Sequence, residues 1–177
     1  PDTEASIVVK EGRSINEANV KWIVSPYDEY AIEEALKLRE KLPGSRVTAV
    51  CLGPERVQNA LRTALAMGAD AAVHVECAAA LDGWNTARAL AHVIAADKPF
   101  GVVFLGRQAI DDDASQVHLL LAETLGIPAA TNVLAFACDG QKVRVEREIG
   151  GGAREVIEMT VPCVVAAAKG LNSPRYA

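Results

Sequence analysis

Apolar and polar residues recur along the first two thirds of the chain with two periods, one typical of strands and one typical of helices. Short runs rich in valine, alanine and leucine predict buried strands, and longer segments with apolar residues three or four positions apart predict helices. The expected elements are helices at 26–42, 55–68, 85–98 and 112–126 and strands at 46–53, 71–76 and 100–106. This alternation predicts an α/β fold with a mostly parallel sheet and helices on both faces.

The helix at 26–42 has the clearest boundaries. Ser25 is expected to cap it, Pro26 suits the first helical position, and Asp28 places negative charge in the first turn. Pro43–Gly44 should end it. The side facing the core is expected to consist of Ile32, Ala35, Leu36, Leu38 and Leu42.

The pattern changes after residue 126, where no convincing helix follows. Asp139–Gly140 and Gly150–Gly152 are hairpin signals. Residues 142–149 alternate apolar and charged positions, which predicts a strand with one solvated face, and 163–168 have the composition of a buried strand. Residues 5–26 read as two short strand-like pieces around a turn containing glycine. We therefore expect one domain, 1–177, with β-hairpin excursions from its sheet.

Composition narrows the function classes. The chain has 177 residues, a net charge of −5 and no basic stripe, which argues against nucleic acid as a partner. Its four cysteines lie far apart without a C-x-x-C pair, and this favours buried free thiols in a reducing cytoplasm. We find no signal peptide and no apolar run near the roughly 18 residues of a membrane span. These features predict a soluble intracellular protein that does not insert into a membrane.

Three consecutive aspartates, Asp111, Asp112 and Asp113, follow the strand at 100–106. A metal site is one interpretation, but consecutive side chains point in different directions and seldom bind one ion together. A general acid–base pair is another, but no nucleophile lies nearby in the sequence. We favour a helix N-terminus, where the carboxylates cap backbone N–H groups. The same helix end could hold a phosphate through Ser115, Gln116 and backbone amides.

Other catalytic and phosphate-binding motifs are missing from the sequence. There is no G-x-x-x-x-G-K-[ST] motif, and no G-x-G-x-x-G follows a strand. The three histidines, His74, His92 and His118, are scattered and more typical of structural or surface residues than of metal ligands. The residues by themselves indicate a nucleotide-binding α/β domain without an evident catalytic group.

Five segments carry a resemblance to a known family: "SPYDEYAIEEALKLREK", "LRTALAMGADAAVHV", "LGRQAIDDDASQV", "KVRVEREIGGGAREVIEMTVPCVV" and "LNSPRYA". Through nearly its whole length the chain resembles the β subunit of electron-transfer flavoproteins. The resemblance implies a Rossmann-like fold of the adenine nucleotide α-hydrolase type. It also implies a heterodimer in which the α subunit carries FAD and passes electrons from acyl-CoA or other dehydrogenases to a quinone reductase or another acceptor.

In that family the β subunit has no catalytic residues of its own. It binds AMP, or a second FAD in electron-bifurcating relatives, and it works in the bacterial or archaeal cytoplasm or the mitochondrial matrix. Carried over by motif position, the implied nucleotide site comprises Ser25, Pro26, Tyr27, Asp28, Leu52, Gly106, Arg107, Gln108, Ala109, Ile110, Asp111, Asp112, Asp113, Ala114, Ser115, Gln116 and Val117.

Within this implied site, Ser115 to Val117 would surround the phosphate, and Tyr27 stands where an aromatic ring approaches the α-subunit flavin. Many AMP-binding members read Asn-Gln-Thr where this chain has Ser115-Gln116-Val117. AMP and FAD therefore both remain open. The chain is also expected to lack the family's first strand and its C-terminal arm. The alternative function is a stand-alone adenine-nucleotide-binding regulatory module of the same fold.

Overall fold

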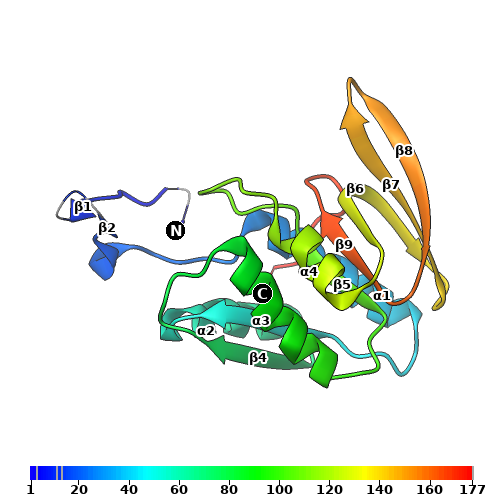
Figure 1. Ribbon diagram of the computed structural model, residues 1–177, viewed down its shortest axis with the longest axis horizontal. Helices are drawn as coiled ribbons and strands as arrows, with labels where there is room; N and C mark the ends of the chain where they lie inside the picture. The colour runs from blue at the N-terminus through cyan, green and yellow to red at the C-terminus, as the bar shows by residue number, and fades with distance from the viewer. Residues whose placement is uncertain (3, 11, 13, 177) are drawn as a thin grey trace.

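The computed structural model describes residues 1–2, 4–10, 12 and 14–176. Its first part alternates helices and strands as expected (Figure 1). The elements are α1 (Pro26–Lys41), β3 (Thr48–Gly53), a 3-10 turn η2 (Glu55–Val57), α2 (Gln58–Met67), β4 (Ala71–Glu76), α3 (Gly83–Ala96), β5 (Val102–Gly106) and α4 (Val117–Leu125). The expected strands are thus confirmed, whereas α3 and α4 begin at other residues than the pattern predicts.

Four strands make up the last third: β6 (Ala129–Cys138), β7 (Lys142–Gly150), β8 (Ala153–Thr160) and β9 (Cys163–Ala167). They form a sheet with β5 in the order β5-β9-β6-β7-β8. The β5–β9 and β6–β9 pairs are parallel, and the β6–β7 and β7–β8 pairs are antiparallel hairpins. Both hairpin turns lie at the predicted glycines, and the α/β fold class is confirmed.

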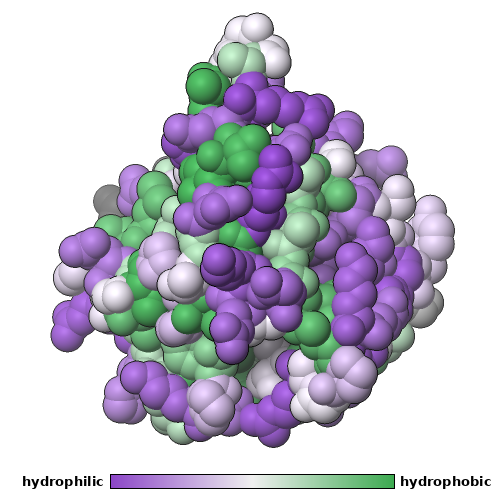
Figure 2. Space-filling view, turned by 90° about the vertical axis from the view of Figure 1, so that its right-hand side faces the viewer, coloured by the Kyte–Doolittle hydropathy of each residue, from purple (hydrophilic) through white to green (hydrophobic). Residues whose placement is uncertain are grey.

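The β7–β8 hairpin shows the predicted alternation. Val143 and Val145 are fully buried, whereas Lys142 before them and Arg144 between them are exposed. Figure 1 shows the hairpin rising beyond the rest of the molecule, and Figure 2, which views that side, shows hydrophilic residues mixed with hydrophobic ones. One face of the hairpin therefore meets solvent while the other covers the core.

A separate parallel pair, β3 and β4, lies beside this sheet. Among the described residues β3 pairs only with β4, and β5 pairs only with β9, so each of the two strands has one open edge. Helix α3 contacts β3 and also packs against Val103 and Leu105 of β5. The two groups of strands are therefore joined through helices and not through a continuous hydrogen-bonded sheet.

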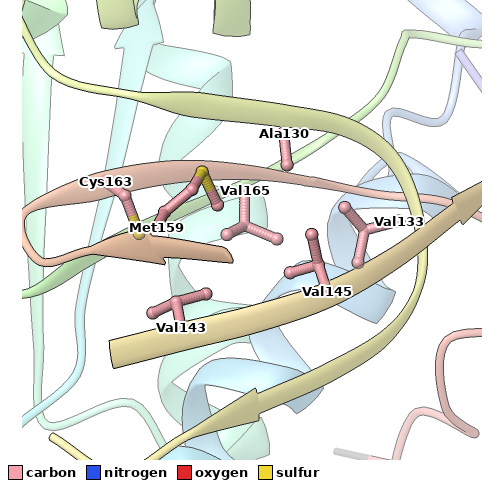
Figure 3. Close-up of a cluster of buried hydrophobic side chains, with 7 residues drawn as sticks. All are labelled: Ala130, Val133, Val143, Val145, Met159, Cys163 and Val165. Carbon is pink, nitrogen blue, oxygen red and sulfur yellow. The ribbon is translucent and has the colours of Figure 1, made fainter. Parts of the chain in front are cut away.

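Side chains of β5 alternate between two apolar cores. Val103 and Leu105 pack with Ala87 and Ala91 of α3 and with Leu121 of α4. Val102 and Phe104 turn the other way, onto a second cluster enclosed by the curved β6, β7, β8 and β9 (Figure 3). That cluster consists of Ala130, Val133, Val143, Val145, Met159, Cys163 and Val165.

The buried side of α1 differs from the prediction. Leu36 is buried as expected, but Ile32, Ala35 and Leu38 are only half-buried. Glu33 and Glu34 are buried instead, at 4% and 6% exposure. Their carboxylates face the C-terminal segment, whose polar side chains bond to them, and this partnership makes their burial tolerable.

The N-terminal segment extends away from the body of the molecule (Figure 1). It contains the two-stranded β1 (Val9–Lys10) and β2 (Ser14–Ile15), followed by the 3-10 turn η1 (Glu17–Asn19). The predicted hairpin is confirmed for these strands, and positions 11 and 13 of its turn lie outside the described residues. Arg56 stacks on Trp22 with 4.1 Å to the ring centroid and bonds Glu17 at 3.0 Å, which ties the segment to η2.

Candidate functional site

The end of β5 meets the first turn of α1. The Gly106 N–H donates a 2.7 Å hydrogen bond to Asp28 Oδ1, although the two residues are 78 positions apart. A Cβ at Gly106 would lie 2.7 Å from Tyr27 Cβ and 2.8 Å from the Asp28 nitrogen. Only glycine lets the strand end approach the helix this closely.

Asp28 is an exposed residue, although many protein atoms lie around its carboxyl group. Desolvation raises its pKa above the usual value, and the bond from Gly106 acts in the opposite direction. Burial and the charge of Asp28 also raise the pKa of the Cys51 thiol. Cys51 and Leu52 lie near the C-terminal end of β3.

The first turn of α1 carries a polar group without a partner. Ser25 is the N-cap residue as predicted, but its side chain makes no capping hydrogen bond. Its Oγ is buried and has no hydrogen-bond partner in the part of the chain that the structure describes. Buried hydroxyls are almost always bonded, so this oxygen is an exception among the described residues. Pro26 occupies the first helical position as predicted.

The loop after β5, residues 107–116, is held by a chain of side-chain bonds. Arg107 Nε donates to Gln108 Oε1 at 2.9 Å, and Ser115 Oγ donates to the same oxygen at 2.9 Å. The Gln108 side-chain amide donates to Asp113 Oδ1. The guanidinium of Arg107 also lies over the Tyr27 ring, 5.5 Å from its centroid. The loop and the α1 N-terminus therefore form one connected group of polar residues.

The predicted role of the three aspartates is wrong. α4 begins at Val117, and its N-cap is Gln116, so none of the aspartates caps it. Asp113 and Ser115 have φ of 51° and 52°, and this left-handed backbone cannot continue a helix. Asp112 Oδ1 accepts from the Ala114 N–H at 3.1 Å, which stabilises a turn before the helix.

The remaining loop positions differ in their surroundings. Ala109 to Ala114 are exposed, and Ser115 is half-buried. The side chain of Gln116 lies against Gly83 at the start of α3, where a Cβ would be 3.3 Å from its Oε1. Apart from Asp113, which accepts from Gln108, the loop tip is therefore not drawn into the connected group, and neither is the Gln116 side chain. Over the described positions no group of three His, Cys, Asp or Glu side chains could hold a metal ion.

Asn132 is a site residue that sequence reasoning missed. Its Oδ1 accepts from Arg107 Nη1 at 2.8 Å, and its Nδ2 donates to the Glu148 carbonyl at 3.0 Å. It has a φ of 59° and lies in the irregular part of β6 between Ala130 and Val133. Asparagine tolerates this backbone better than most residues, but nothing in the local pattern signals a bulge.

His118 in the first turn of α4 is 2% exposed, and its Nε2 lies 3.2 Å from Thr131 Oγ1. Burial lowers its pKa, so it packs as a neutral imidazole beside the loop.

Within the described residues no helix is long and apolar enough to cross a membrane.

Comparison with known proteins gives the class of protein that this fold and this strand-end site represent. Residues 13–177 match the family model described as the electron transfer flavoprotein domain. The chain is 40% identical over 177 residues to the electron transfer flavoprotein subunit beta of Dictyostelium discoideum, with 99% of this chain and 70% of the relative covered. The corresponding subunit of Bacillus subtilis (strain 168) is 42% identical, with 99% and 68% covered.

The mouse (Mus musculus) subunit is 41% identical over 181 residues, with 99% of this chain and 70% of the relative covered. The chain belongs to the electron transfer flavoprotein β-subunit family. The resemblance described from its motifs is thereby confirmed.

Proposed function

We propose that this chain binds an adenine nucleotide, either AMP or FAD, where the α1 N-terminus, the end of β3 and the loop 107–116 meet. The observation that carries the proposal is the convergence of Ser25–Asp28 with Gly106–Ser115 through the contact between Asp28 and Gly106. Parallel α/β sheets bind ligands beyond the carboxyl ends of their strands. The unpartnered Ser25 hydroxyl at this position supports a polar ligand.

Arg107 supports a ligand that carries phosphate. Its hydrogen-bond partners in the described residues are the neutral side chains of Gln108 and Asn132 and the Ala167 carbonyl, and no carboxylate lies within ion-pair distance. The positive charge is held in place but not neutralised, which suits a phosphate. Ser115, by turning its hydroxyl away from Gln108, and backbone N–H groups at the start of α4 would add neutral donors. The carboxylate of Asp113 is held in place by the bond from the Gln108 amide.

The proposed role in electron transfer is that of a supporting subunit. An α subunit would carry the FAD that accepts and passes on electrons from acyl-CoA or other dehydrogenases to a quinone reductase or another acceptor. This chain would bind the nucleotide and support the partner's flavin site near Tyr27, with no catalytic residue of its own. The expected compartment is the cytoplasm of a bacterium or archaeon, or the mitochondrial matrix.

We further propose that one more parallel strand lies between β3 and β5. Both strands have an open edge in the described residues, and α3 contacts both of them. Open edges of buried strands leave backbone groups without hydrogen bonds, which is costly. Hydrogen exchange on the protein in its complex tests this. The backbone amides of β3 that face away from β4, and those of β5 that face away from β9, should be protected. Fast exchange of these amides would contradict the proposal.

The nucleotide proposal is tested on the complex purified with an α-type partner. Ligands are released by denaturation, separated by chromatography and quantified against the heterodimer. One flavin with one AMP would indicate AMP in this subunit, and two flavins would indicate FAD. Release of no adenine nucleotide and failure to pair with a flavoprotein would overturn the proposal. Reversible binding of ATP by a homodimer would favour the stand-alone regulatory module.

Two substitutions assign the phosphate contacts. Arg107→Gln and Ser115→Ala should each weaken nucleotide retention about tenfold or more, because each removes a donor to an anion. Arg62→Gln is the matched control, since Arg62 is exposed on α2 and bonds only Gln58 and Asn59. Equal retention in all three variants would exclude the loop as the phosphate site.

A further inference from the structure

A cavity lies beside the C-terminal half of α1, away from the strand-end site. It has a volume of about 510 Å³ and opens between the C-terminal half of α1, strand β6 and Leu171. The lining residues are Glu34, Lys37, Glu40, Lys41, Leu134, Ala135, Phe136 and Leu171. Charged side chains thus come from the helix, and apolar ones from the strand and the C-terminal segment.

Glu34 is the only one of these lining residues that is buried, at 6% exposure. Its Oε2 accepts a 2.9 Å hydrogen bond from Asn172 Nδ2, which also donates to the Tyr30 carbonyl. In the described part of the chain nothing donates to Glu34 Oε1, and no cation lies within ion-pair distance. Asn172 Oδ1 beside it is buried without a partner. The deep end of the cavity therefore offers acceptors and lacks a donor.

The mouth of the cavity has the opposite charge. Lys37 and Lys41 follow Glu34 on one side of α1, at axial separations of about 4.5 and 10.5 Å. Over the described positions neither ammonium has a carboxylate within ion-pair distance, and Glu40, the other acid at the mouth, bonds Arg175 at 2.9 Å. The cavity thus has a negative, buried end and a positive, accessible end.

We propose that this cavity binds a small zwitterion, a molecule with an ammonium group and a carboxylate joined by an aliphatic chain. The ammonium would supply donors to Glu34 Oε1, to which no described residue donates a hydrogen bond. The carboxylate would lie between Lys37 and Lys41. The methylenes would pack on Leu134, Phe136 and Leu171, which line the cavity between its two charged ends. The proposal does not depend on the nucleotide site.

The test uses 6-aminohexanoate as the probe, with the protein in complex with its α-type partner and titration calorimetry as the readout. Hexylamine and hexanoate each keep one charged end and the apolar chain. Saturable binding of 6-aminohexanoate, with at least about tenfold weaker binding of both single-charge analogues, is the expected result. No saturable binding, or equal affinity of all three compounds, would overturn the proposal.

Substitutions then locate the bound probe. Glu34→Gln keeps the shape of the side chain and should lower affinity for 6-aminohexanoate about tenfold while leaving hexanoate unchanged. The double change Lys37→Gln with Lys41→Gln should weaken the binding of hexanoate and leave that of hexylamine unchanged. Because it alters no buried group, this variant still tests the site if Glu34→Gln fails to fold. Glu158→Gln, an exposed position on β8, is the control and should bind as the unchanged protein does. Unchanged affinity in the lysine variant would refute the site.

Discussion

Replacing Gly106 by alanine is a direct test of the contact between β5 and α1. The added Cβ would lie 2.7 Å from Tyr27 Cβ and 2.8 Å from both the nitrogen and Oδ1 of Asp28. Two of these atoms belong to the backbone or to the Cβ of a helix that is packed against β5. They cannot move without shifting the first turn of α1, so the clash is not relieved by rotating a side chain.

The magnitude follows from two contributions. Overpacking of this kind costs about 1–3 kcal/mol. Displacing the Asp28 carboxylate also lengthens its 2.7 Å hydrogen bond from the Gly106 N–H, a loss of about 1 kcal/mol. Gly106→Ala should therefore lower the free energy of unfolding by roughly 2–4 kcal/mol in a urea titration. If the proposed nucleotide binds there, the same variant should release it more readily, because the displaced turn carries Ser25.

Gly101, the residue just before the same strand, provides the control. A Cβ there would meet nothing within 4 Å, so Gly101→Ala should leave the free energy of unfolding unchanged or raise it by up to about 1 kcal/mol. If Gly106→Ala and Gly101→Ala unfold with free energies within about 0.5 kcal/mol of each other, the close approach of β5 to α1 is not what the geometry indicates.

Three further predictions concern buried polar groups. Burial lowers the pKa of His118, so below about pH 6.5 the unfolded chain binds a proton that the folded chain does not, and stability should fall as the pH drops through that window. Urea titrations should show a shallower fall for His118→Gln than for the exposed control His92→Gln. Equal falls in the two variants would contradict this. Burial alone would raise the pKa of Glu33, but its bonds from Arg175 hold that pKa below its usual value. Arg175→Gln should therefore lower the free energy of unfolding by about 1.5–3 kcal/mol at neutral pH, and the effect should vanish in acid once Glu33 is protonated. A loss that does not depend on pH would argue against this. Asn132→Ala should lower the free energy of unfolding by roughly 2–3 kcal/mol in a denaturant titration, because it strains a backbone with a φ of 59° and removes two hydrogen bonds. Asn132→Gly removes the same hydrogen bonds without the backbone strain, so it should cost less than Asn132→Ala, and equal losses would contradict this.

Structural features that depend on residues close together in the sequence could be predicted from the sequence. The glycines at 140 and 150–152 form hairpin turns because they permit positive φ, which they have at 100°, 101°, 61° and 77°. Pro26 begins α1 because its ring fits the first helical position. Motif resemblance, which uses the order of many residues together, indicated the family that the comparisons confirm.

Local rules failed where tertiary contacts compete with them. Asp111 to Asp113 suit a helix N-terminus by composition, but the loop bonds within itself through Gln108 and Ser115 and delays α4 to Val117. Glu33 and Glu34 read as solvent-facing residues of α1, but Arg175 and Asn172 bond to them. In both cases the deciding partner is not a helix neighbour, so the helical period could not reveal it.

The sequence by itself determined the order of strands and helices, the hairpin turns and the family, because these follow from short-range periodicity, turn chemistry and motif order. The tertiary structure alone decided which residues meet: Gly106 with Asp28 across 78 positions, Arg107 with Asn132 across 25, and Arg175 with Glu33 across 142. These contacts depend on the order of strands in the sheet and on a bulge in β6. Such long-range geometry is set by the packing of whole elements, and no single segment of the sequence specifies it.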